Sequence, residues 1–341
     1  MGPLLLTIPK KPCDNLMDLL IIDTLDAEVV HWLESRHSVR YAPELALDAR
    51  EFRAALYNVR ALILPASVSF GPPVLPFAPM LRAVGRINGG AENIDADACA
   101  RAGIEVVRSA TATAQAEAEF MIGALLSMLR RVPVSGPDGM RVGRELGAAT
   151  VGLIGMPPAA RAMASMLSGF GCRVVGYEPS LHASDGVWDR WKVVPMPLRE
   201  LIETTDALAV QLNYFSRYQG LLGERLLSHC KPHQVMVSVS HSGVFDERAL
   251  AEVLSSGRMA AAWLDSLEPG ALDEGRPLRG VGNLQITPRL ASTTRESRLR
   301  SAWAVARRID ELLMATSVAP SEFRSTAPGV PLDLAAEPES P

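Results

Sequence analysis

This sequence has no excess of basic residues and few aromatic side chains. Its 34 Lys and Arg residues are outnumbered by 38 Asp and Glu residues, so the formal net charge is −4. Aromatic residues make up only 5% of the chain. Proteins that bind nucleic acid neutralise phosphates with basic side chains and stack bases on aromatic rings. The composition therefore predicts no nucleic-acid partner.

The chain also has few cysteines and no long apolar segment. Cys13, Cys99, Cys172 and Cys230 are far apart and form no CxxC pair, which argues against a local zinc site and a disulfide framework. No apolar run reaches the roughly 18–20 residues of a membrane span. Met1–Leu6 is too short for the apolar region of a signal peptide. We therefore expect a cytoplasmic protein with reduced thiols, no metal site and no membrane contact.

The length and the apolar pattern predict two α/β domains. A domain usually has roughly 100–200 residues, and this chain has 341. Short apolar runs of strand length alternate with helical patterns, which is typical of βαβ units and a parallel sheet. The expected strands lie at Asp18–Asp23, Val39–Tyr41, Ala61–Leu64, Leu81–Ile87, Thr150–Gly155, Cys172–Gly176, Ala207–Gln211, Gln234–Val239, Ala260–Leu264 and Leu284–Ile286.

The junction between the two domains is predicted near a long apolar helix over Ala116–Leu129. The segment Pro133–Gly147 is rich in glycine and proline and is interpreted as a connector. Residues 1–16 are predicted to form a loose leader. Residues 317–341 contain several prolines among small and polar residues and are predicted to be a disordered tail.

One strand–glycine–helix turn resembles a dinucleotide-binding turn. That turn needs the pattern G-x-G-x-x-G or G-x-G-x-x-A, and the aligned residues here are Gly155, Pro157 and Ala160. Proline has no N–H and carries a ring where the phosphate would approach, and Pro158 removes a second donor. The predicted cofactor site at this turn is therefore weakened, and it comprises Gly155, Pro157, Ala159 and Ala160.

The next strand supports the nucleotide interpretation because it ends in Glu178. Its distance along the chain from Gly155 is close to the roughly 20 residues expected for the acid that binds the ribose. An acid at this place favours a free 2′-hydroxyl, and hence NAD over NADP. The alternative is that Glu178 is simply a solvated strand end.

At this point the sequence resembles the D-isomer-specific 2-hydroxyacid dehydrogenases, the family of phosphoglycerate and glyoxylate/hydroxypyruvate reductases. The resemblance runs from about Met17 to Ala315 and rests on ordered blocks rather than one motif. These blocks are Gly85–Asp95, Ala102–Val107, Ala116–Phe120, Gly143–Leu146, Thr150–Gly155, Gly243–Leu250, Leu264-Asp265 and Ile286–Pro288.

The resemblance implies two doubly wound parallel-sheet lobes, flavodoxin-like or Rossmann-like, with a cleft between them. It assigns residues 17–115 and 290–316 to a substrate-type lobe and residues 116–289 to a Rossmann dinucleotide-binding lobe. It also implies NAD as the cofactor, a small 2-oxo or 2-hydroxy acid as the substrate, and a homodimer formed through the nucleotide lobe.

The family reaction moves a hydride between NAD and a 2-hydroxy or 2-oxo acid with the help of an arginine, a glutamate and a histidine. The resemblance places these three positions at His241, Gly270 and Arg289, so all three are substituted. The block that presents backbone amides to the substrate carboxylate corresponds to Asn88, Gly89 and Gly90. Asp265 matches the family aspartate beside the nicotinamide amide and is retained.

These substitutions make ordinary turnover doubtful, because loss of a positioned acid or base alone costs roughly 10²–10⁴ in rate. The alternative function is a non-catalytic regulator or scaffold subunit that binds a nucleotide or a small acid. A third hypothesis notes that one histidine and one arginine have changed places, so that a reversed substrate could put its carboxylate on Arg289 and its oxygen near His241. The sequence favours a chance exchange, because the family glutamate is absent and no residue obviously orients a ring nitrogen of His241. Glu268 is the one possible stand-in for that glutamate, two residues from the vacant position.

Overall fold

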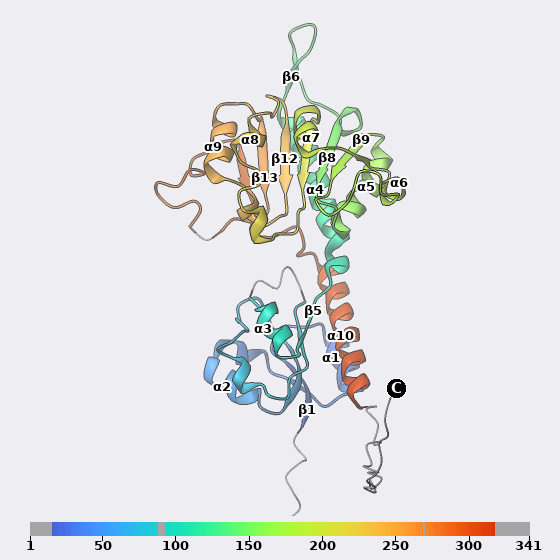
Figure 1. Ribbon diagram of the computed structural model, residues 1–341, viewed down its shortest axis with the longest axis vertical. Helices are drawn as coiled ribbons and strands as arrows, with labels where there is room; N and C mark the ends of the chain where they lie inside the picture. Colours follow the sequence, from blue (N-terminus) through green and yellow to red (C-terminus); the bar gives the residue numbers. More distant parts are fainter. Residues whose placement is uncertain (1–15, 88–92, 269, 318–341) are drawn as a thin grey trace, which may run out of the picture.

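The computed structural model describes residues 16–87, 93–268 and 270–317. They form two lobes that lie one above the other in Figure 1, and the long helices α4 (Ala110–Arg131) and α10 (Arg295–Ser317) connect them. The predicted leader, apart from Leu16, and the predicted tail, apart from Ser317, lie outside the described residues. The α/β prediction is confirmed.

The first lobe is built on a five-stranded parallel sheet in the order β2-β1-β3-β4-β5. This is the flavodoxin-like order. The strands are β1 (Met17–Ile21), β2 (Val39–Tyr41), β3 (Val59–Ile63), β4 (Ala83–Gly85) and β5 (Glu105–Val107). The helices are α1 (Ala27–Glu34), α2 (Ala49–Ala55), α3 (Ala96–Arg101) and the short 3₁₀ turns η1 (Pro43–Leu47) and η2 (Leu75–Phe77).

The second lobe has a seven-stranded parallel sheet in the order β10-β9-β8-β11-β12-β13-β14. The strands are β8 (Thr150–Ile154), β9 (Arg173–Tyr177), β10 (Val194–Pro195), β11 (Ala207–Val210), β12 (Val235–Ser238), β13 (Ala261–Leu264) and β14 (Leu284–Ile286). The helices are α5 (Pro158–Phe170), α6 (Val187–Trp191), α7 (Leu198–Thr204), α8 (Glu224–Leu227), α9 (Glu247–Ser255), η3 (Leu146–Ala148), η4 (Ser216–Tyr218) and η5 (Ser242–Val244).

The strand order of the second lobe places its binding edge. The order reverses between β8 and β11, as in the doubly wound dinucleotide fold, and ligands of such sheets bind outside the carboxyl ends of the strands. In Figure 1 the strands of this sheet run toward the first lobe, so their carboxyl ends face it. The loops after β8, β9, β11, β12, β13 and β14 are therefore the ones that can form a site.

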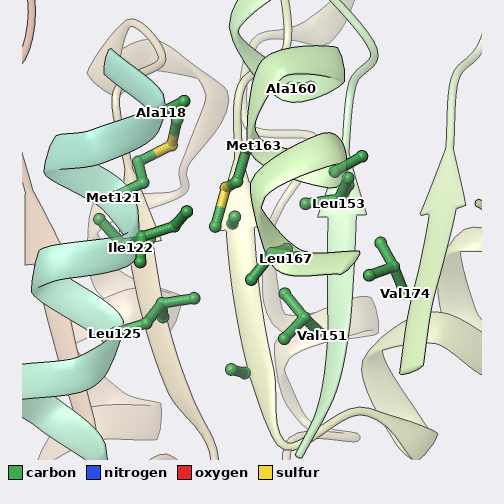
Figure 2. Packing of buried hydrophobic residues seen from close by; sticks show 14 of the residues in the cluster. Ala118, Met121, Ile122, Leu125, Val151, Leu153, Ala160, Met163, Leu167 and Val174 are labelled. Carbon is green, nitrogen blue, oxygen red and sulfur yellow. The ribbon is translucent and has the colours of Figure 1, made fainter. Parts of the chain in front are cut away.

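The core of the second lobe lies where α4 and α5 pack over its sheet (Figure 2). Met121 and Leu125 of α4 meet Met163 and Leu167 of α5 above Leu153 of β8, and all five side chains are fully buried. Burial of a large apolar side chain is worth roughly 1.5–3 kcal/mol. This packing holds the start of α5, and with it the glycine turn, in a fixed place against β8.

Helix α4 begins earlier than the sequence predicted. It starts at Ala110 rather than Ala116, and Ser109 caps it by accepting a hydrogen bond from Ala112 N at 3.3 Å. The proposed lobe boundary at residue 116 therefore falls inside a helix. Near its start α4 contacts α10, where Arg300 Nε donates to Ala112 O at 3.1 Å.

Helix α10 returns to the first lobe and packs on its sheet. A Cβ atom at Gly85 of β4 would lie only 2.7 Å from Val305 Cγ1 and 3.0 Å from Ile309 Cδ1. Glycine at this position therefore allows α10 to approach the strand. Helix α10 thus contributes Val305 and Ile309 to the packing on this sheet.

The segment that was interpreted as a connector contains a small hairpin. Its strands β6 (Val134–Ser135) and β7 (Arg141–Val142) are antiparallel. In Figure 1 the hairpin projects from the end of the second lobe that lies away from the first. Among the described residues, no helix combines the length and the apolar character needed to cross a membrane.

Candidate functional site

The glycine turn after β8 depends on glycine at its first position. Gly155 has φ +92°, and a Cβ atom there would lie 2.8 Å from backbone atoms of Gln211 and Leu212. Any other residue would therefore be strained in its backbone and would push the loop after β11 away. Gly155 N also donates to Tyr177 O at 2.7 Å, which ties the turn to the end of β9.

Two prolines open the helix that follows. Pro157 is the residue before α5 and Pro158 is its first residue, so neither offers an N–H to a ligand. Among the described residues, no side chain caps this helix. The amides of Ala159 and Ala160 have no partner inside the helix, as is general for a first turn. The helix start therefore keeps two amide donors and its positive dipole end.

Glu178 lies beside this turn and is not a solvated strand end. Its Oε2 accepts a hydrogen bond from Met156 N at 2.9 Å. Its Oε1 accepts from Ser180 N at 3.2 Å and from Ser180 Oγ at 2.8 Å. The structure thus brings the two sequence signals, Gly155 and Glu178, to the same edge of β8 and β9.

Arg161 also belongs to this turn, although the glycine pattern does not predict a role for it. Its Nε donates to Met156 O at 2.9 Å, and its guanidinium lies 4.8 Å from the centre of the Trp191 ring. A positive charge is therefore fixed next to the two prolines. The only sequence signal was its place directly after the alanine that ends the glycine pattern.

Asp265 holds the chain segment that follows β14. The side chain is buried, and its Oδ1 accepts from Thr287 Oγ1 at 2.6 Å and from Leu290 N at 2.8 Å. Its Oδ2 accepts from Ala291 N at 2.8 Å. The carboxylate that is predicted to lie beside nicotinamide thus accepts hydrogen bonds from Thr287, Leu290 and Ala291.

Arg289 lies in the segment that Asp265 holds. Its backbone N donates to Asp265 O at 2.7 Å, and its φ is +55°, a left-handed conformation that is uncommon outside glycine. Its side chain is exposed. The backbone at position 289 is therefore held by its hydrogen bond to Asp265, and the side chain there ends in a guanidinium.

His241 has a well-defined ring orientation, contrary to the sequence expectation. His241 Nε2 lies 2.8 Å from Glu268 Oε1, and Gly243 N donates to His241 Nδ1 at 3.1 Å. The ring stacks on Tyr214 with centroids 4.3 Å apart. Ser242 Oγ in turn accepts from Glu268 N at 3.1 Å, which holds the acid in place.

Glu268, rather than the residue at position 270, is the acid that reaches this place. Gly270 has φ +80°, and a Cβ atom there would lie 3.0 Å from Asp273 Oδ2. The segment after β13 therefore turns at Gly270 and presents Glu268 to the ring. Asn88, Gly89 and Gly90 lie outside the described residues.

A second acid faces the same region from α4. Burial raises the pKa of Glu117, a hydrogen bond with Thr113 lowers it, and the charge of Asp265 raises it, with a net rise. Glu117 is therefore partly buried near Asp265.

Among the described residues, no group of three or more His, Cys, Asp or Glu side chains is arranged to hold a metal ion.

Comparison with known proteins identifies relatives along nearly the whole chain. Residues 129–291 match the family model described as D-isomer specific 2-hydroxyacid dehydrogenase, NAD binding domain. The (S)-sulfolactate dehydrogenase of Chromohalobacter salexigens is 31% identical over 294 residues, which cover 84% of this chain and 95% of that protein. The D-3-phosphoglycerate dehydrogenase of Rattus norvegicus is 29% identical over 302 residues, which cover 86% of this chain but 56% of that protein.

Solved structures share the fold. The TT0316 protein from Thermus thermophilus has a TM-score of 0.71 at 23% identity, with 88% of this chain and 97% of that chain covered. A glyoxylate reductase from Paecilomyes thermophila has a TM-score of 0.71 at 20% identity, with 88% and 96% covered. At these identities the likeness concerns the fold alone.

Proposed function

Because this chain belongs to the D-isomer-specific 2-hydroxyacid dehydrogenase family and contains its NAD-binding domain, we propose that it binds NAD(H) but turns over ordinary 2-hydroxy and 2-oxo acids far more slowly than a relative that has the family's arginine and histidine. The proposal rests on the exchange of histidine and arginine between positions 241 and 289, which follow β12 and β14. The residue after Thr287-Pro288 is Arg289, and the residue after β12 that should clamp a carboxylate is His241.

The proposed cofactor contacts follow from the glycine turn. The diphosphate would lie against the start of α5, held by the amides of Ala159 and Ala160. The positive charge of Arg161 would compensate in part for the N–H donor that Pro157 lacks. Glu178 would accept a hydrogen bond from a ribose hydroxyl, which favours NAD over NADP. Bound NAD(H) supplies or accepts the hydride of the family reaction.

The proposed loss of turnover has two physical causes. A guanidinium remains protonated throughout the physiological pH range, so Arg289 cannot exchange a proton with a substrate oxygen. A substrate carboxylate next to His241 would also meet Glu268 instead of an arginine. The two groups act as a unit, so their joint loss is worth roughly 10²–10⁴ in rate.

A titration of the purified protein with NADH, followed by the fluorescence of the nicotinamide, tests this proposal. We expect saturable binding and no more than trace oxidation with glyoxylate, hydroxypyruvate or pyruvate. Arg161→Ala should weaken binding about tenfold, as for a charged hydrogen-bond partner. Arg190→Ala, an exposed change on α6, is the matched control. Absence of binding by either NADH or NADPH would instead favour a scaffold.

We also propose that the protein is a cytoplasmic homodimer. The projecting hairpin of β6 and β7 supports this, because Met140 is 63% exposed and Val142 is 44% exposed on it. The described cysteines, Cys99, Cys172 and Cys230, are unpaired and buried, as in a reducing compartment. Light scattering should give twice the chain mass, and Met140→Glu combined with Val142→Glu should yield monomers.

A further inference from the structure

The pair formed by His241 and Glu268 carries a net negative charge. Gly243 N donates to His241 Nδ1, so Nδ1 presents its lone pair and the ring proton lies on Nε2. Nε2 then donates to Glu268 Oε1 at 2.8 Å. The imidazole is neutral in this arrangement, and the carboxylate keeps its charge.

The carboxylate retains capacity for another donor. The Glu268 side chain is 49% exposed. Within residues 16–87, 93–268 and 270–317, no group donates a hydrogen bond to Oε2 of this carboxylate. The acid is nevertheless held in place, because Ser242 Oγ accepts from its backbone N–H. A ligand donor can therefore meet a carboxylate oxygen that the protein has already positioned.

An aromatic ring borders the same place. Tyr214 stacks on His241, and a Cβ atom at Gly243 would lie 3.1 Å from Tyr214 Cε2. The ring is thus packed against the backbone of η5 and partly exposed. A carboxylate beside an aromatic ring favours an ammonium group, through charge and through the negative face of the ring.

The opposite charge lies on the same edge of the sheet. His241 follows β12, Glu268 follows β13 and Arg289 follows β14, and these three strands are neighbours. Strands lie about 4.8 Å apart, so the ends of β12 and β14 are separated by about 10 Å. A guanidinium has five N–H donors and can hold a carboxylate through two of them.

From this juxtaposition we infer that the site takes a small zwitterion, an α-amino acid, with its ammonium group at Glu268 and Tyr214 and its carboxylate at Arg289. A 2-oxo acid has no positive group to place near Glu268. The inference rests on the proposed function, since it names the ligand class for the same site.

Alanine and pyruvate are matched probes, because both have three carbons and a carboxylate and they differ in the ammonium group. We would titrate each alanine enantiomer and pyruvate into the free protein and into the NADH-saturated protein by calorimetry. One enantiomer of alanine should bind about tenfold tighter than pyruvate. Glu268→Gln keeps the hydrogen bond to His241 but removes the charge, and it should abolish this preference. Glu274→Gln, an exposed change on the same segment, should preserve it.

This experiment distinguishes failure of the proposed function from failure of the inference about the amino-acid ligand. A lack of NADH binding would contradict the proposed function, and the preference for alanine would still be measured on the free protein. Equal or tighter binding of pyruvate by the natural chain would overturn the inference. Equal effects of Glu268→Gln and Glu274→Gln would overturn it too, as would the absence of binding by any of the three acids at millimolar concentration.

Discussion

Glu268 Oε1 lies 2.8 Å from His241 Nε2, although the two residues follow different strands of the second sheet. An acid that the family position 270 does not supply is therefore already present at the site. Among the three catalytic positions, the exchange at 241 and 289 is the remaining difference from the arrangement that the resemblance implies.

Reversing this exchange should restore turnover. The double variant His241→Arg with Arg289→His would provide a carboxylate clamp and a proton donor, and histidine tolerates the left-handed backbone at position 289 better than most residues. We expect the rate of NADH oxidation with glyoxylate or hydroxypyruvate to rise by about 10²–10⁴. Each single variant should gain far less, and equal rates for the double variant and the natural chain would contradict the account.

A glutamate added at position 270 should not help. Gly270 has φ +80°, and a side chain there costs roughly 1–2 kcal/mol in backbone strain. Gly270→Glu in the double variant should therefore lower the midpoint of thermal unfolding and leave the rate no higher. A gain in rate would show that the segment after β13 is arranged differently.

The proline before α5 should limit NADH affinity. Pro157→Gly restores an N–H donor and removes the ring, and one added hydrogen bond is worth about 1 kcal/mol. Fluorescence titration should therefore show a dissociation constant about fivefold lower. Pro157→Ala restores the donor but not the space, and it should gain less. Unchanged affinity in both variants would place the diphosphate elsewhere.

Asp310 should join α10 to the first lobe in a pH-dependent way. Burial alone would raise the pKa of Asp310, but hydrogen bonds from Arg36 and His37 outweigh it, and the pKa is lowered. Its contribution to stability is therefore present above the unfolded pKa and is lost as the pH falls through the folded pKa.

Asp310→Asn should cost about 1–3 kcal/mol at neutral pH, and urea unfolding should show the difference shrinking in acid. Glu311→Gln, the exposed neighbour on α10, should cost much less. A cost for Asp310→Asn that stays constant from pH 7 to strong acid would contradict the assigned ion pairs.

Glu117 should have the opposite pH dependence. Its pKa is raised, chiefly by burial, so its contribution to stability is fully present below the unfolded pKa and is lost as the pH rises through the folded pKa. Glu117→Gln should therefore raise the unfolding midpoint at neutral pH and have little effect in acid. Glu119→Gln, an exposed change on the same helix, is the control, and a destabilised Glu117→Gln would contradict the assignment.

Most of the fold could be predicted from the sequence because its signals are local. Apolar runs predicted β2 (Val39–Tyr41) and β14 (Leu284–Ile286) at their observed bounds. The start of α4 was missed because Ala110–Gln115 is small and polar, and the cap at Ser109 and the contact with α10 extend the helix there.

The site was predicted less completely, because its contacts join residues distant in sequence. The spacing of Gly155 and Glu178 could be recognised, since it follows from one βαβ unit. The stacking of Tyr214 on His241 depends on how the loops after β11 and β12 meet. The turn at Gly270 decides which acid faces the ring, and a position count along the chain could not show that.

The most direct test of the central claim is a pair of measurements on the unmodified chain: NADH binding by fluorescence, and NADH oxidation with glyoxylate, hydroxypyruvate and pyruvate. The account predicts saturable binding with a rate about 10²–10⁴ below that of the doubly exchanged variant. Brisk oxidation with any of the three acids, or no binding of NADH at millimolar concentration, would contradict it.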